Sequence, residues 1–219
     1  MRRSKLTWVV VACALSMSAL AAEDASACGA SMEAAFVPSA EAIAEAERLA
    51  MRGQYFTAAI LVHHEFPTMK SWSREWAMSG LEARAERVMA LAVTRMDGAL
   101  TLGTPWRGWT AWHRNEQLEW AVGALEQLDR EENDPRLESY LGEAMAKIPK
   151  RRADALMLLE RLATNDVLVT PQAYVALAKL RDARGDAAGR DDAKSRCVSM
   201  TSRVLRSEDA ATCRIPIAS

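Results

Sequence analysis

The sequence predicts an all-α protein in which about four antiparallel helix pairs form a short stack, with an irregular helical bundle as the alternative. Alanine, leucine, glutamate and arginine dominate the 219 residues, whereas there are only 10 glycines and 7 prolines. Apolar residues recur every three or four positions, which places them on one face of a helix. The helical repeat domain is expected over residues 38–206, between a flexible linker at 22–37 and a carboxy-terminal tail at 207–219.

The amino-terminal half of this domain predicts a helix pair followed by two longer helices. The first pair is expected over residues 39–66, with a turn at Gly53. A longer helix is expected over residues 71–96, and the next over residues 109–131. The loop between them, at residues 98–108, contains three glycines and a proline, which interrupt helices.

Two dipeptides that end in proline predict helix starts in the second half of the domain. They are Asp134-Pro135 and Thr170-Pro171. The side-chain oxygen of the first residue can accept from a free amide of the first turn, and proline has no amide to leave unpaired there. The partner helices are expected over residues 151–163, after Pro149, and over residues 187–206, after a turn at Gly185.

Two of the predicted pairs contain similar segments around their turns. Residues 46–58 and 177–186 each place a small residue on the first helix shortly before a glycine turn. These segments resemble tetratricopeptide repeats, in which a small residue at the helix crossing lets two helix axes approach closely. The similarity covers residues 40–67 and 135–200, although the tryptophan-leucine-glycine-tyrosine signature of that family is not intact in any copy. It implies stacked helix pairs whose concave surface holds a peptide or a partner protein.

The first 21 residues have the composition of a secretory signal peptide. A basic start at residues 1–5 precedes an apolar run at residues 6–20, which is short for a bilayer-spanning helix. Small residues fit the cleavage rule at residues 19–21 and again at 25–27, so cleavage is expected after residue 21 or as late as residue 27. We therefore expect an exported protein, periplasmic or secreted, from a bacterial cell.

The charge of the exported chain bears on its partners. Without the signal it has 25 basic and 29 acidic side chains, a formal charge of −4. A mildly acidic chain gives no electrostatic basis for binding nucleic acid or an anionic membrane surface. No transmembrane segment is expected after the signal.

Three cysteines follow the signal core, namely Cys28, Cys197 and Cys213, and an odd number leaves one thiol over. In one interpretation Cys28 is lipidated after cleavage at residue 27, and Cys197 pairs with Cys213. In another, cleavage near residue 21 leaves Cys28 free to pair with Cys197 or Cys213. Cys197–Cys213 is the favoured disulfide, because the tail can fold back on the last helix. In a third interpretation all three thiols stay unpaired.

No catalytic, cofactor-binding or metal-binding motif stands out. His63 and His64 are adjacent, so on a helix they point about 100° apart and do not form a two-histidine metal face. The remaining histidine is His113, which leaves no evident further ligand. We therefore predict that the protein is not an enzyme and has no cofactor.

A tryptophan-rich segment, Trp106, Trp109 and Trp112, is followed directly by His113 and Arg114. Such rings could form a peptide-binding surface, because tryptophan dominates binding hot spots. They could instead seal the long loop against the helices and bury a large apolar area. The second interpretation is favoured, since aromatic rings mostly lie in cores.

These observations favour a non-enzymatic interaction or scaffold module of the cell envelope, whose partner is a protein or peptide. A structural or accessory lipoprotein anchored through Cys28 is the alternative. An enzyme with an unfamiliar site near His113 is the third and least favoured hypothesis.

Overall fold

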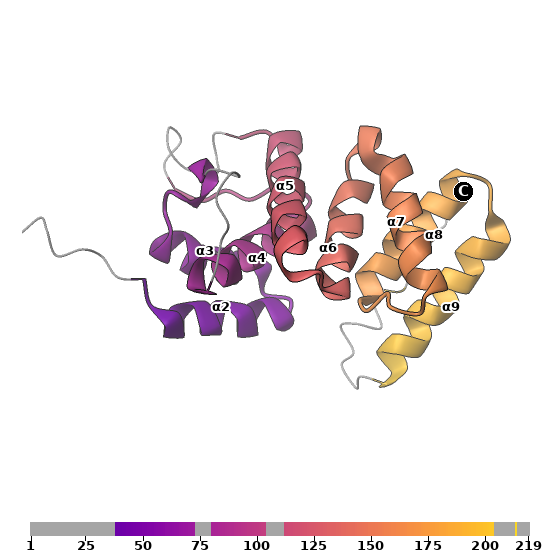
Figure 1. Ribbon diagram of the computed structural model, residues 1–219, viewed down its shortest axis with the longest axis horizontal. Coiled ribbons are helices and arrows are strands. Elements are labelled where there is room, and N and C mark those ends of the chain that lie inside the picture. The colour runs from indigo at the N-terminus through magenta and orange to yellow at the C-terminus, as the bar shows by residue number, and fades with distance from the viewer. Residues whose placement is uncertain (1–37, 73–79, 104–111, 204–212, 214–219) are drawn as a thin grey trace, which may run out of the picture. The chain divides into compact units, whose positions relative to one another are not determined.

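A computed structural model describes residues 38–72, 80–103, 112–203 and 213, and within these ranges the regular structure is entirely helical (Figure 1). This confirms the predicted all-α class. The elements in chain order are α2 (Ala40–Met51), α3 (Tyr55–Glu65), η1 (Met69–Ser71), α4 (Gly80–Arg95), α5 (Arg114–Glu132), α6 (Pro135–Ala146), η3 (Pro149–Arg151), α7 (Arg152–Thr164), α8 (Pro171–Ala183) and α9 (Ala187–Arg203). The two η elements are single 3-10 turns.

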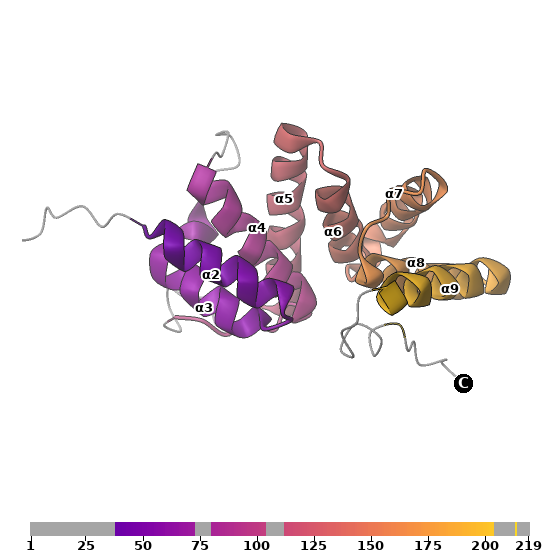
Figure 2. The same cartoon turned by 90° about the horizontal axis from the view of Figure 1, so that it is seen from below.

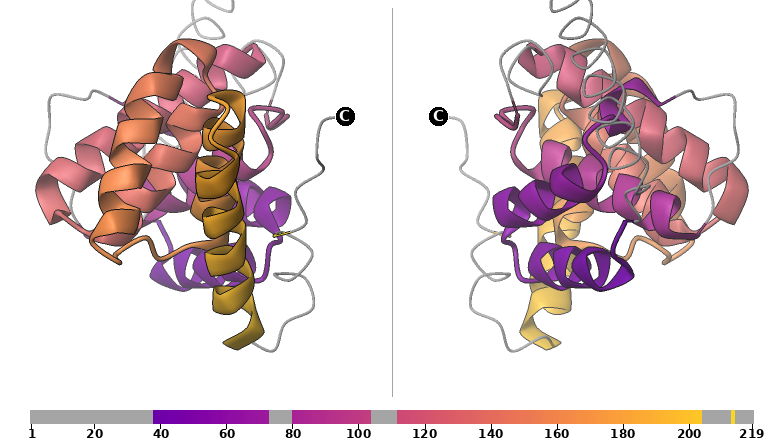
Figure 3. Two further views of the ribbon diagram at one scale, coloured as in Figure 1. Left: turned by 90° about the vertical axis from the view of Figure 1, so that its right-hand side faces the viewer. Right: turned by 90° about the vertical axis from the view of Figure 1, so that its left-hand side faces the viewer.

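Consecutive helices pack as pairs, α2 with α3, α4 with α5, α6 with α7 and α8 with α9 (Figure 2). The second helix of each pair also packs against the first helix of the next pair. The first helices, α2, α4, α6 and α8, contact one another in the same order. Figure 3 views this arrangement from its two ends, with α9 nearest in one view and α2 and α3 nearest in the other. The packing is consistent with the predicted stack of helix pairs.

Side-chain caps set the starts of the helices where the sequence predicted them. The carboxylate of Asp134 accepts from the backbone amide of Arg136 at 2.9 Å, and the hydroxyl of Thr170 accepts from the amide of Ala173 at 3.2 Å. Both caps precede a proline at the first helical position, which has no amide to satisfy. The turn that joins α8 to α9 passes through Gly185 at φ 83°, a backbone region that favours glycine.

Two predicted helix boundaries are wrong. The third helix does not start at Ser71, which ends η1, because Trp72 has an extended backbone and its ring packs edge-on against Phe66 at 5.3 Å between centroids. In the described residues α4 begins at Gly80. The next helix begins at Arg114 rather than near residue 109, since the backbone of His113 is extended. The apolar spacing could not distinguish tryptophans on a helix from tryptophans that pack in a connection.

The start of the long connection between α4 and α5 is held against α5. The side-chain amide of Gln117 donates to the Leu100 carbonyl at 2.9 Å, and its oxygen accepts from the Leu100 amide at 3.0 Å. Leu100 is fully buried. A β-carbon on Gly98 would lie 2.5 Å from the Arg114 carbonyl oxygen, so only glycine allows this approach. These contacts fix the position of Asp97, which pairs with Lys147 at the site described below.

The tail is tied to α9. The sulfur atoms of Cys197 and Cys213 lie 2.09 Å apart, which confirms the favoured disulfide. Both residues are buried, and the Cys197 sulfur lies 3.3 Å from the carbonyl oxygen of Pro171. The disulfide therefore lies where α9 meets the first turn of α8.

The helices α6 and α7 cross at Gly142. A β-carbon at this position would lie 2.5 Å from Leu159 Cδ2 and 2.8 Å from Leu159 Cγ, both closer than van der Waals contact. Leu159 is fully buried, so it has little room to move. A small residue at a crossing is the feature expected of closely packed pairs, although the sequence reasoning had not singled out Gly142.

We expect Gly142→Ala to lower the free energy of unfolding by up to about 2 kcal/mol. Overpacking of a filled core costs roughly 1–3 kcal/mol, and the better helix propensity of alanine returns up to about 1 kcal/mol. Urea denaturation measures the change. The matched control is the same substitution in a Leu159→Ala background, where the clash is absent and the alanine should be neutral or stabilising. Equal destabilisation in both backgrounds would contradict the assigned contact.

Candidate functional site

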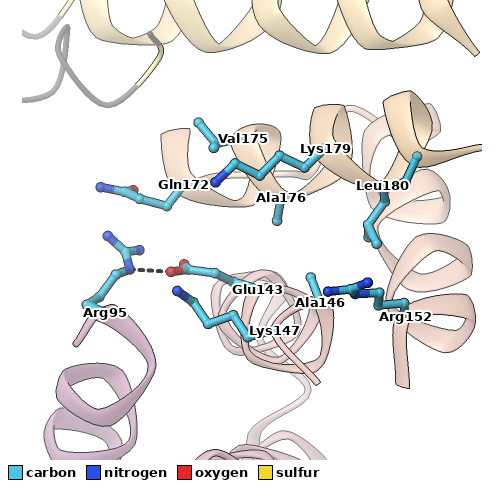
Figure 4. Close-up of a pocket in the computed structure, with 11 residues that line it drawn as sticks. Arg95, Glu143, Ala146, Lys147, Arg152, Gln172, Val175, Ala176, Lys179 and Leu180 are labelled. Atoms are coloured by element: carbon cyan, nitrogen blue, oxygen red, sulfur yellow. Dashed lines mark ion pairs between the residues drawn. The ribbon is translucent and has the colours of Figure 1, made fainter. Parts of the chain in front are cut away.

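A cavity of about 420 Å³ lies where α4, α6, α7 and α8 meet (Figure 4). We call it the basic cavity, because its lining contains four cationic side chains and one acidic side chain. Its lining residues are Arg95, Glu143, Ala146, Lys147, Arg152, Gln172, Val175, Ala176, Lys179, Leu180 and Ala183. The volume falls within the range of about 300–1,000 Å³ that is usual for ligand sites in proteins.

A second cavity, of about 320 Å³, adjoins the first and shares Arg95 and Gln172 with it. We call it the adjoining cavity. It is lined by residues of α2, α3, α4, α6 and the start of α8, among them the apolar or aromatic side chains of Ala50, Met51, Tyr55, Leu91 and Tyr140. The two cavities together therefore extend across the first helices of all four pairs.

An ion pair between Arg95 and Glu143 lies where the two cavities adjoin. Both residues line the basic cavity, and Arg95 also lines the adjoining cavity. Arg95 Nε lies 2.7 Å from Glu143 Oε1, and the side chains are only 9% and 5% exposed. Arg95 Nη1 also donates to the Tyr55 hydroxyl at 3.1 Å. The Nε–H does not align with the carboxylate as a hydrogen bond, and Glu143 Oε2 has no hydrogen-bond partner among the described residues. The pair thus neutralises its own charges but leaves one buried acceptor unsatisfied.

The other three cations of the basic cavity come from three helices. Lys147 follows the last turn of α6, Arg152 begins α7, and Lys179 lies on α8. Figure 4 shows Lys147 and Lys179 extending toward the Arg95–Glu143 pair. Lys147 Nζ lies 3.5 Å from the Asp97 carboxylate. Within the described part of the chain, the side chains of Arg152 and Lys179 make no hydrogen bond or ion pair.

Asp97 only partly offsets the charge of Lys147. Its two carboxylate oxygens accept from Arg114 at 2.9 and 2.7 Å, and these hydrogen bonds lower the pKa of Asp97 below its ordinary value. Its negative charge is therefore shared between two cations. The distance from Asp97 to Lys147 is longer than its distances to Arg114, so Asp97 offsets the charge of Lys147 less. Lys147 therefore keeps a surplus of positive charge toward the cavity.

Tyr140 forms part of the wall of the adjoining cavity. Burial is the main influence on its phenol and raises its pKa, because a phenolate would be poorly solvated there. The nearby guanidinium of Arg95 acts in the opposite direction. Tyr140 is therefore a neutral group with an aromatic face and a hydroxyl at its edge.

Sequence reasoning had not singled out these cavity residues. Lys150, Arg151 and Arg152 are consecutive basic residues, yet they differ in the structure. Lys150 pairs with Glu119 at 2.7 Å and Arg151 with Glu126 at 2.5 Å, whereas Arg152 lines the basic cavity. The first and last cations of the lining, Arg95 and Lys179, are more than 80 positions apart, so no local pattern could reveal the set.

The predicted tryptophan surface is only partly described. Trp106 and Trp109 lie outside the described residues. Trp112 is half-buried against the core, and Lys70 Nζ lies 4.6 Å from the centre of its ring. The backbone amide of His113 donates to the Glu116 carboxylate at 2.8 Å, at the start of α5. Neither Trp112, His113 nor Arg114 lines the two cavities, and this surface stays a prediction.

The other sequence features add no second site. His63 is partly buried, which lowers its pKa, and His64 Nδ1 lies 3.1 Å from the Glu65 carboxylate. Within the described ranges, no group of three or more histidine, cysteine, aspartate or glutamate side chains is arranged to hold a metal ion. None of the helices in those ranges has the length and apolar character needed to cross a bilayer.

Comparison with protein-family models, with curated proteins and with solved structures gave no match.

Proposed function

We propose that the protein is a non-enzymatic interaction module that binds an extended peptide segment across the basic cavity and the adjoining cavity. The observation that carries this proposal is that the two cavities share Arg95 and Gln172 and so adjoin along one face of the helices. Two adjoining hollows suit a ligand that is longer than either one. A peptide segment has that length and offers a side chain to each hollow.

The chemistry of the walls supports a peptide ligand. The basic cavity offers cations and an aliphatic wall, and the adjoining cavity offers aliphatic and aromatic side chains beside the charged groups of Glu47, Arg87, Arg95 and Arg136. Met51 is 73% exposed at the edge of the adjoining cavity, and an exposed methionine adapts readily to different apolar partners. The similarity to tetratricopeptide repeats implies the same use, since those repeats hold peptides on their stacked helices.

A bulky side chain at Gln172 tests this function, because Gln172 borders both cavities. Random peptides displayed on phage are selected on the purified exported protein, and their affinities are then measured by fluorescence anisotropy. We expect Gln172→Trp to weaken the selected peptides by at least about tenfold, or roughly 1.4 kcal/mol. Tryptophan should fill the space that a peptide would occupy.

The matched control is Thr57→Trp, which adds the same ring at an exposed position on α3 that lines neither cavity. Peptides should bind this variant like the unmodified protein. Enrichment of no peptide, or peptides that bind all three proteins equally, would overturn the proposed function.

Export to the cell envelope belongs to the same proposal, and one observation favours a lipid-anchored form. Because Cys197 and Cys213 are paired, Cys28 is the cysteine left over after the signal. Lipidation of Cys28 would account for it. Mass spectrometry of the mature amino terminus is expected to find a diacylglyceryl group on Cys28. A mature chain that begins with unmodified Ala22 would instead indicate a periplasmic or secreted protein.

A further inference from the structure

We infer that the basic cavity selects an acidic peptide segment, in which glutamate or aspartate side chains accompany an aliphatic one. This inference rests on the proposed function and specifies the chemistry of its ligand. The exported chain is acidic overall, with a formal charge of −4, yet one cavity gathers four cations around a single carboxylate.

The cations of the basic cavity are not equally available to a ligand. Glu143 neutralises Arg95 at 2.7 Å, and Asp97 partly neutralises Lys147 at 3.5 Å. Arg152 and Lys179 have no such partner among the described residues, and both are exposed to solvent. The cavity therefore keeps an excess positive charge that an incoming carboxylate would offset.

The positions of the cations favour a ligand with more than one carboxylate. Arg152 and Lys179 belong to different helices, α7 and α8, and Lys147 comes from the end of α6. In Figure 4, Arg152 lies on the opposite side of Ala146 from the Arg95–Glu143 pair, whereas Lys147 and Lys179 extend toward that pair. One carboxylate would meet one or two of these groups, whereas successive acidic side chains of a peptide could meet all three.

The remaining walls point to a peptide rather than to an inorganic anion. Ala146, Val175, Ala176 and Leu180 give the cavity an aliphatic wall, which an aliphatic side chain would cover. An inorganic anion such as phosphate has no apolar part that could cover this wall.

Fluorescence anisotropy with a defined probe tests the inference. The probe is a short fluorescein-labelled peptide rich in glutamate and leucine, and its counterpart carries glutamine in place of every glutamate. We expect the acidic peptide to bind the exported protein at least about tenfold more tightly than the glutamine peptide. Added salt should reduce this difference, because salt screens exposed charges.

Two double variants with the same net charge test whether the preference for the acidic peptide comes from the basic cavity. Arg152→Gln/Lys179→Gln removes the unpartnered cations and should weaken the acidic peptide by at least about tenfold. Arg130→Gln/Lys194→Gln removes two cations from α5 and α9 that line neither cavity, and it should bind normally. Circular dichroism verifies that both variants are folded.

The outcomes separate this inference from the proposed function. If the two double variants weaken the acidic peptide equally, or if the glutamine peptide binds as well as the acidic one, the inference is overturned. The proposed function still stands if peptides selected by display lose affinity on Gln172→Trp. Binding of inorganic phosphate or of anionic lipid vesicles without binding of the acidic peptide would also overturn the inference.

Discussion

Glu143→Ala is expected to lower the free energy of unfolding by about 3–5 kcal/mol, because it leaves the Arg95 guanidinium buried without its counter-ion. The side chains of this pair are only 9% and 5% exposed, so the guanidinium that remains is poorly solvated. Equilibrium urea denaturation followed by circular dichroism measures the change.

The control replaces both members of the pair with apolar side chains of similar size. We expect Arg95→Met/Glu143→Leu to be much less destabilising than the single variant, since removal of a whole buried pair is often neutral or stabilising. Some cost is expected from the hydrogen bond between Arg95 and the Tyr55 hydroxyl, which is lost as well. A double variant that is as unstable as Glu143→Ala would show that the pair contributes through something other than its charges.

The second large effect concerns the disulfide. Cys197→Ala/Cys213→Ala should lower stability by about 3 kcal/mol, since a bridge across 16 residues restricts the unfolded chain by roughly that amount. For a chain of this size, the melting temperature should fall by roughly 6–12 °C. Differential scanning calorimetry measures the shift.

Reduction provides the matched control. Dithiothreitol should lower the melting temperature of the unmodified protein by a similar amount and leave the double alanine variant unchanged. An unmodified protein that melts at the same temperature with and without reductant would contradict a stabilising role for this bridge.

Much of the fold could be predicted because its signals are local. The caps at Asp134 and Thr170, the turn at Gly185 and the Cys197–Cys213 pair follow from a few neighbouring residues and elementary chemistry. The boundary at Ser71 could not be predicted, because the contact of Trp72 with Phe66 depends on the tertiary fold.

The candidate site was beyond such local signals. Arg95, Glu143 and Lys179 are ordinary charged residues on three separate helices, and only the packing of α4, α6 and α8 brings them to one cavity. The sequence instead pointed to the tryptophan-rich segment as a candidate binding surface. Of its described members, Trp112 packs against the core, and the backbone amide of His113 donates to Glu116 at the start of α5. Charge at a tertiary junction leaves no periodic pattern in the sequence.

We expect a peptide to bind along the face formed by the first helices of the pairs. Amide chemical-shift mapping by nuclear magnetic resonance, with a peptide selected by display, tests it most directly. We expect the largest shifts around Glu143, Lys147 and Gln172, with smaller ones near Tyr55. Shifts confined to the second helices, α3, α5, α7 and α9, would contradict it.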